Sequence, residues 1–154
     1  MDDMYHEITP EVQERIDGLI ENYEHAALAT MDERFPLISK VMPVVDDGEI
    51  YLLMSDLSEH TRHIRTHSKR VCLYFAHSEG HTSRMNNPRY SIMGKLYPAP
   101  FTNDKRSEMF QKLLKKFDVV SKGAKMYGMF HDFHIYRFEK YEQLYIEGFG
   151  KAYK

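Results

Sequence analysis

Apolar residues recur along this chain at two different spacings, and the spacing separates helices from strands. In residues 9–23 they recur every three or four positions, which predicts an amphipathic helix. Thr9 is its expected N-cap and Pro10 its first helical residue, because a hydroxyl before the first turn and a proline within it both favour a helix start. Residues 102–117 repeat the pattern and predict a second amphipathic helix. The buried face of this helix is expected to hold Met109, Phe110, Leu113, Leu114 and Phe117.

Between and after these helices, the apolar residues form short runs of β-type composition bounded by turn residues. The runs cover residues 26–31, 36–45, 49–54, 70–77, 88–98, 133–138 and 144–153. Six or seven short strands with three helical interruptions predict a mainly β, α+β fold, a split β-barrel of Greek-key type with helices packed outside it. At 154 residues the chain is expected to form one domain, 1–154, in which residues 1–24 carry the N-terminal helix that packs on the barrel.

The third helical interruption is the polar stretch MSDLSEHTRHIRTH, residues 54–67, which follows directly after a strand-like run. Asp56 is its expected N-cap, with Glu59 three residues later at the spacing of a capping box. The helix would then run from about residue 57 to residue 66. Leu57, Thr61 and Ile64 fall on one stripe, which is expected to face the barrel.

Three histidines of this stretch, His60, His63 and His67, have a spacing at which two of them could share a metal ion. No Glu, Asp or Cys stands beside them in a zinc-ligand pattern such as H-E-x-x-H. The sequence therefore favours a solvated helix with incidental histidines, and no metal site is predicted here.

Residues 54–67 indicate an anion-binding site more strongly than a metal site. A strand that runs straight into a helix presents unpaired backbone N–H groups and the positive end of the helix dipole. Ser55, Ser58 and Thr61 add hydroxyl donors, and His60 and Arg62 add donors that can carry positive charge. This combination indicates a small anionic ligand.

Composition narrows the classes of partner. Lys and Arg number 21 against 23 Asp and Glu, a formal net charge of −2, so neither a general nucleic-acid binder nor an acidic-membrane binder is expected. The N-terminus, MDDMYHEITP, lacks the basic and apolar regions of a signal peptide, and no apolar run approaches the ~20 residues of a membrane span. The single cysteine, Cys72, excludes an internal disulfide and suits a reducing cytoplasm.

Four motifs in a fixed order carry a resemblance to a known family: LSEHTRHIR, NNPRYSIMGKL, FHDFHIYRF and YIEGFGKAY. Together with the preceding HAALATMDERFPLISKVMPVV, they make residues 25–153 resemble the pyridoxamine 5′-phosphate oxidase-like, FMN-binding split-barrel superfamily. The resemblance is closest to its haem-utilisation branch, of the HugZ/HutZ type.

The resemblance implies an FMN-binding, flavin-dependent oxidoreductase that acts on a small-molecule substrate, a homodimer with its cofactor at the interface. In the family the strand that here holds Ser39 and Lys40 faces the flavin, the strand-to-helix turn binds its phosphate, and the position of Arg89 reaches the flavin or, in the haem branch, a propionate. The implied cofactor-binding residues are Ser39, Lys40, Ser55, Ser58, His60, Thr61, Arg62 and Arg89. An FMN site requires no catalytic triad, because the cofactor carries the redox chemistry.

Two alternatives stay open. A haem-binding or haem-degrading protein needs an axial ligand and cationic partners for two propionates. The family's usual axial histidine lies beyond the GFGKA segment and has no counterpart here, so His131 or His134 would have to substitute, with Asp132 orienting the ligand. The second alternative is a cofactor-free ligand-binding or interaction module. The loop 77–87, with His77 and His81, is expected to be an ordinary polar loop.

Overall fold

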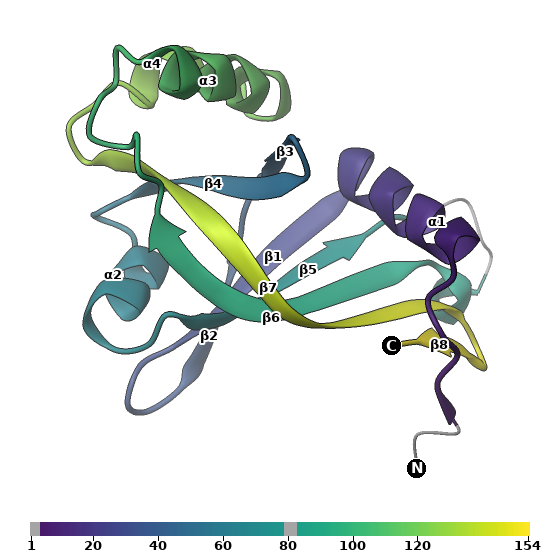
Figure 1. Ribbon diagram of the computed structural model, residues 1–154. Coiled ribbons are helices and arrows are strands. Elements are labelled where there is room, and N and C mark those ends of the chain that lie inside the picture. Colours follow the sequence, from purple (N-terminus) through teal and green to yellow (C-terminus); the bar gives the residue numbers. More distant parts are fainter. Residues whose placement is uncertain (1–3, 79–82) are drawn as a thin grey trace.

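The computed structural model describes residues 4–78 and 83–154, which form one antiparallel sheet of eight strands with helices around it (Figure 1). The strands are β1 His25–Met31, β2 Pro36–Lys40, β3 Val44–Asp46, β4 Glu49–Ser55, β5 Arg70–Ala76, β6 Arg89–Pro98, β7 Phe133–Gly148 and β8 Lys151–Tyr153. Their order is β2-β1-β5-β6-β7-β4-β3, with β8 paired to β7. The two ends of this order, β2 and β3, are consecutive in the chain, so the sheet curves round without closing. The predicted mainly β split-barrel fold is confirmed.

The strand count differs from the predicted six or seven because two runs were divided wrongly. The run 36–45 forms two strands, β2 and β3, since the chain bends between Lys40 and Val44. The runs 133–138 and 144–153 were predicted as separate strands, but the first and the start of the second belong to the 16-residue β7. The polar residues 139–143 separate the two apolar runs in the sequence, so the continuity of the strand is not visible there. In the structure these residues also pair with β6, with a bulge between Met93 and Gly94.

The helix α1, Pro10–Glu21, begins as predicted, with the Thr9 hydroxyl accepting a hydrogen bond from the Val12 N–H at 3.3 Å. Its apolar face inserts Val12, Ile16 and Leu19 into the core formed by the inner faces of the strands. The segment before α1 lies beside β8 (Figure 1), where the His6 N–H donates to the Ala152 carbonyl at 2.8 Å.

A second core lies under α3, Glu108–Val120, and the short α4, Ala124–Tyr127, which cover β3 and β4 (Figure 1). Four of the five predicted core residues of α3 are buried, whereas Met109 is only partly buried. The helix begins six residues later than predicted, at Glu108, because Ser107 is its N-cap and accepts from the Phe110 N–H at 3.2 Å.

The helix α2, Glu59–Thr66, follows β4 and also begins later than predicted. Its N-cap is Ser58, not Asp56, because the Asp56 carboxylate is engaged elsewhere. Thr61 and Ile64 are buried as expected, but Leu57 precedes the helix and is 85% exposed. A short 3₁₀ turn, Arg84–Asn86, occupies part of the predicted loop 77–87, in which His81 lies outside the described residues.

The buried carboxylate of Asp46 gives this fold a testable acid sensitivity. Asp46 is 7% exposed, and hydrogen bonds from Lys116 and Lys112 on α3 hold its pKa below the ordinary value. The two lysine Nζ atoms lie 2.9 and 3.0 Å from its Oδ1 atom. A depressed pKa in the folded state stabilises the fold above the unfolded pKa, near 3.9, and this stabilisation is lost as pH falls through the folded value.

Asp46→Asn is therefore expected to lower the free energy of unfolding at pH 7 by about 1–3 kcal/mol. The variant should also lose less stability than the parent chain between pH 5 and pH 2. Denaturant unfolding across this range measures both effects, with the adjacent exposed Asp47→Asn as control. Equal acid slopes in Asp46→Asn and the parent would contradict the assignment.

Candidate functional site

The turn between β4 and α2 is hydrogen-bonded to Asp132, the residue that precedes β7. Ser55, at the end of β4, donates its hydroxyl hydrogen to the Asp132 carboxylate at 2.6 Å and accepts from the Leu57 N–H at 3.1 Å. The Asp56 N–H donates to the Asp132 carbonyl at 2.7 Å. The hydrogen bond from Ser55 also lowers the pKa of Asp132, so this carboxylate is ionised beside the turn. The turn is thus held in one conformation by Asp132.

The Asp56 carboxylate links the turn to α2 and to β7. It contacts Arg65 Nη1 at 3.0 Å and His134 Nε2 at 3.1 Å. These two contacts replace the helix cap predicted for Asp56, and they balance its charge.

The N-terminus of α2 has no side-chain cap, whereas Thr9 and Ser107 cap α1 and α3. The Ser58 hydroxyl makes no capping hydrogen bond. The Thr61 hydroxyl, one turn further on, is buried without a hydrogen-bond partner among the described residues. Uncapped first-turn N–H groups are the donors that anions bind at helix N-termini.

The negative charge of Glu59 would repel an anion at the N-terminus of α2, but Arg62 forms an ion pair with it. Both Arg62 Nη2 and Nε donate to Glu59 Oε2, at 2.7 and 3.1 Å. These hydrogen bonds lower the pKa of Glu59 and raise that of Arg62. Arg62 therefore neutralises Glu59 and does not extend toward the turn as predicted from sequence.

A hollow of about 490 Å³, here called the cationic hollow, adjoins the turn. It is lined by Thr102, Asn103, Asp104, Lys105, Arg106, Met129, His131 and His134. Four of these residues are basic and only Asp104 is acidic. His134 also contacts Asp56, so the hollow and the turn share a wall.

Lys105 lies at the base of the cationic hollow, where hydrogen bonds hold its side chain. Its ammonium group donates to the Gly128 carbonyl at 3.3 Å and to the Phe130 carbonyl. Partial burial lowers the pKa of Lys105. Sequence reasoning missed Lys105 and Arg106 because residues 102–107 were assigned to a helix. The turn residues Asn103 and Asp104 were the available signal that the segment is a loop.

Three other predicted residues lie on β2 and in the first turn of α2. Ser39 and Lys40 pair with Leu28 and Ala27 on neighbouring positions of β2, so their side chains are on opposite faces of the sheet. His60 is partly buried, which lowers its pKa.

Arg89 starts β6 opposite Ala76, and its guanidinium donates to the carbonyls of Met85 and Asn87 at 3.2 and 3.3 Å. The β5–β6 ladder has Arg89 and Ala76 at one end and Arg70 and Lys95 at the other, and the second end is the one next to α2. The two ends of this ladder are six residues, or about 20 Å, apart. Within one chain, Arg89 and the turn are therefore not brought together.

An apolar surface, here called the outer sheet face, is formed by Ala29, Met31, Ile38, Cys72 and Met93. The strand register places these residues on one face, with Ala29 opposite Ile38 and Cys72, and Cys72 opposite Met93. Met31 and Ile38 are 53% and 74% exposed. A shallow groove of about 570 Å³ runs along this face.

Two kinds of feature are absent from the described residues. No group of three or more His, Cys, Asp or Glu residues there could hold a metal ion. Nor does any helix in residues 4–78 and 83–154 have the length and apolar character needed to cross a membrane.

Comparison with known proteins identifies the fold family. Residues 20–154 match the family model described as CREG, β-barrel. No curated protein matches the chain. The predicted resemblance to the pyridoxamine 5′-phosphate oxidase-like split-barrel superfamily, with its haem-utilisation branch, is confirmed.

Three solved structures illustrate the similarity. Campylobacter jejuni ChuZ has a TM-score of 0.79 and 20% identity, over 96% of this chain and 60% of that one. HutZ, the haem storage protein from Vibrio cholerae, has a TM-score of 0.68 and 16% identity, over 89% and 92%. A putative pyridoxamine 5′-phosphate oxidase from Listeria innocua has a TM-score of 0.65 and 14% identity, over 89% and 99%. At these identities the structures support the fold. The chain spans only 60% of the length of ChuZ.

Proposed function

The chain belongs to the CREG β-barrel family, and on this premise we propose that it binds FMN at a homodimer interface and acts as a flavin-dependent oxidoreductase on a small-molecule substrate. The observation that carries the proposal is the cationic hollow beside the uncapped N-terminus of α2. This arrangement fits a phosphate group, which needs several N–H and O–H donors and a surplus of positive charge.

The residues around the turn fit the phosphate although the carboxylates of Asp56, Glu59 and Asp132 are nearby, and Asp132 accepts a hydrogen bond from Ser55. Asp56 is paired with Arg65 and His134, and Glu59 with Arg62. The first-turn amides of α2, the Ser58 hydroxyl and the side chain of Arg106 would hold the phosphate. Lys105 would add positive charge from the floor of the hollow.

The outer sheet face supplies the second requirement, an apolar wall for a planar ring. Its small and flexible side chains, Ala29, Cys72 and Met93, leave a flat surface with Lys40 at its border. FMN, when bound, supplies the hydride or electron transfer. The chain's own residues would anchor the phosphate, exclude water from the ring and place a positive charge near it. Because Arg89 lies at the end of the β5–β6 ladder that is farther from α2, it could contribute only across the dimer interface.

The same outer sheet face is the surface on which we expect the second copy of the chain to pack. Ile38→Ser removes an exposed apolar side chain from the β2 side of this face and is expected to weaken the dimer by about 1–2 kcal/mol per subunit. Val119→Ser is the matched control, because Val119 is 85% exposed on α3, away from this face. Sedimentation equilibrium measures both. A dimer weakened equally by both variants, or by neither, would place the interface elsewhere.

Haem is the second candidate, because His131 and His134 share the cationic hollow with Lys105 and Arg106. A histidine ligand beside two cations is what a haem and its propionates require. Asp132, which follows His131 and is fixed by Ser55, would orient the ligand. The similarity to HutZ, described as a haem storage protein, supports haem binding as this candidate, with haem degradation as the activity we propose for it. The cytoplasm remains the proposed compartment, because the lone Cys72 suits a reducing environment.

Absorption titration of the purified chain with FMN and with haemin separates the candidates. Saturable flavin bands with a shifted maximum support FMN binding, and a saturable Soret band that shifts in His131→Ala or His134→Ala supports haem. Binding of neither compound would overturn both and leave the cofactor-free module.

A further inference from the structure

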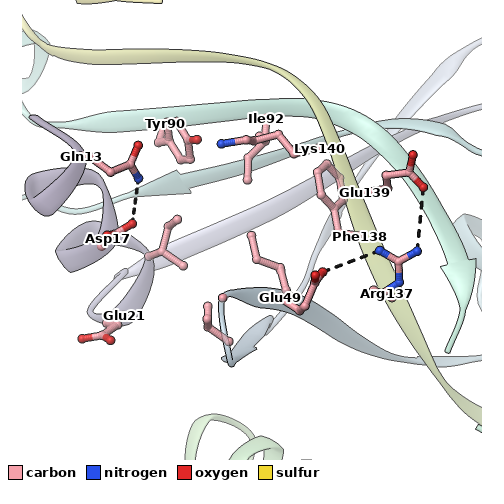
Figure 2. Close-up of a pocket in the computed structure, with 14 residues that line it drawn as sticks. Gln13, Asp17, Glu21, Glu49, Tyr90, Ile92, Arg137, Phe138, Glu139 and Lys140 are labelled. Atoms are coloured by element: carbon pink, nitrogen blue, oxygen red, sulfur yellow. Dashed lines mark hydrogen bonds and ion pairs between the residues drawn. The ribbon is translucent and has the colours of Figure 1, made fainter. Parts of the chain in front are cut away.

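A separate hollow of about 550 Å³ lies between α1, the β3–β4 hairpin and the middle of β6 and β7 (Figure 2). Its volume is in the range of small-molecule sites, about 300–1,000 Å³. Glu49 and Ile50, which line this hollow, are the first two residues of β4. The β4–α2 turn begins at the other end of the same strand. The two places are therefore about 20 Å apart along β4. We call this place the α1 hollow.

The walls of the α1 hollow are apolar at its base and charged at its rim. Partly buried Ile20 and Ile50 come from α1 and β4, and the buried Tyr90, Ile92 and Phe138 form the base. Four carboxylates line it against two cations: Asp17, Glu21, Glu49 and Glu139 against Arg137 and Lys140.

Both cations are already engaged by neighbouring side chains. Arg137 lies between Glu49 and Glu139, with nitrogen–oxygen distances of 3.7 and 3.9 Å (Figure 2). Lys140 donates to the Gln143 side-chain oxygen at 3.2 Å, the atom that also accepts from the Tyr90 hydroxyl. Four carboxylates against two cations leave the α1 hollow with a net negative charge, and two of those carboxylates, Asp17 and Glu21, lie on α1.

The two α1 carboxylates lie where helix electrostatics disfavours them. Among the described residues, the hydrogen-bond donor to Asp17 is the neutral amide of Gln13, at 2.9 Å (Figure 2). Asp17 and Glu21 are four residues apart, so their like charges repel along one face of the helix. Both lie toward the C-terminal end of α1, whose dipole repels negative charge and whose last turn holds no basic residue. A bound cation would relieve both repulsions.

We propose that the α1 hollow binds a small organic cation, an amine on an apolar body. The ammonium group lies between Asp17, Glu21 and Glu49, and the apolar body packs on Ile20 and Ile50. The aromatic rings of Tyr90 and Phe138 below add a weaker attraction for the cation. This site requires neither FMN nor haem.

Three six-carbon probes test the proposal on the full chain: hexylammonium, hexanol and hexanoate. Chemical-shift titrations by NMR are expected to show hexylammonium binding about tenfold more tightly than the other two, with shifts at Ile20 and Ile50. Hexanoate or hexanol binding as tightly as hexylammonium would overturn the proposal.

A matched pair of double variants then tests the location of the site. Asp17→Asn with Glu21→Gln is expected to weaken hexylammonium binding about tenfold. Glu11→Gln with Glu14→Gln removes the same charge from exposed positions of the same helix and should leave the affinity within about twofold. Equal weakening by the two pairs would mean general charge attraction and would reject the site.

Discussion

Replacing Gly94 by alanine is expected to lower the free energy of unfolding by about 3 kcal/mol. A Cβ atom at this position would overlap the Glu139 backbone carbonyl and would lie 2.9 Å from two ring carbons of the buried Phe138. The neighbour that must yield is backbone, in the β6–β7 ladder at the bulge between Met93 and Gly94. Relieving this overlap requires a shift of the β7 backbone. The expected loss of stability is therefore at the upper end of the range for overpacked cores.

Gly18→Ala is the matched control for this substitution. Gly18 lies inside α1, and an added Cβ atom there would meet nothing within 4 Å. Alanine is the better helix former, so this change is expected to stabilise the fold by up to about 1 kcal/mol. Denaturant unfolding followed by circular dichroism measures both. A Gly94→Ala protein as stable as the parent would show that the bulge is not packed as described.

Arg106→Glu is expected to weaken FMN binding by about 10- to 100-fold, or about 1.5–3 kcal/mol. Arg106 lines the cationic hollow from an exposed loop position, so its reversal changes the charge that meets the phosphate and leaves the core untouched. The hollow would then hold two carboxylates from this loop in place of one.

Lys115→Glu controls for the change in net charge, which is the same in both variants. Lys115 is exposed on α3, nine residues along the chain from Arg106. Quenching of flavin fluorescence on binding gives the two affinities. Equal losses in Arg106→Glu and Lys115→Glu would indicate attraction by the whole protein and not by the hollow.

Local patterns predicted much of the fold because each element has one buried face. The helical spacing in residues 9–23 and the Thr9 cap depend on neighbours within one turn, and both were correct. The continuity of β7 was missed because the residues between its two apolar parts are polar and give no strand pattern. These residues are in a strand because they pair with β6, which is distant in sequence.

The candidate site was predictable only in part, for a similar reason. Ser55 and Ser58 stand out because a strand meets a helix there, a local signal. The contact between Asp56 and His134 spans 78 residues, so no spacing rule could show that it would remove Asp56 from the helix cap. The approach of Lys105 and Arg106 to the turn likewise depends on how β7 pairs with β4.

The affinity of the chain for FMN compared with riboflavin tests the central claim most directly, because the two flavins differ only in the phosphate group. Phosphate binding at the α2 N-terminus and the cationic hollow predicts that FMN binds at least about tenfold more tightly. It also predicts that this preference disappears in Arg106→Glu. Equal affinities of the parent chain for FMN and riboflavin would contradict the phosphate site.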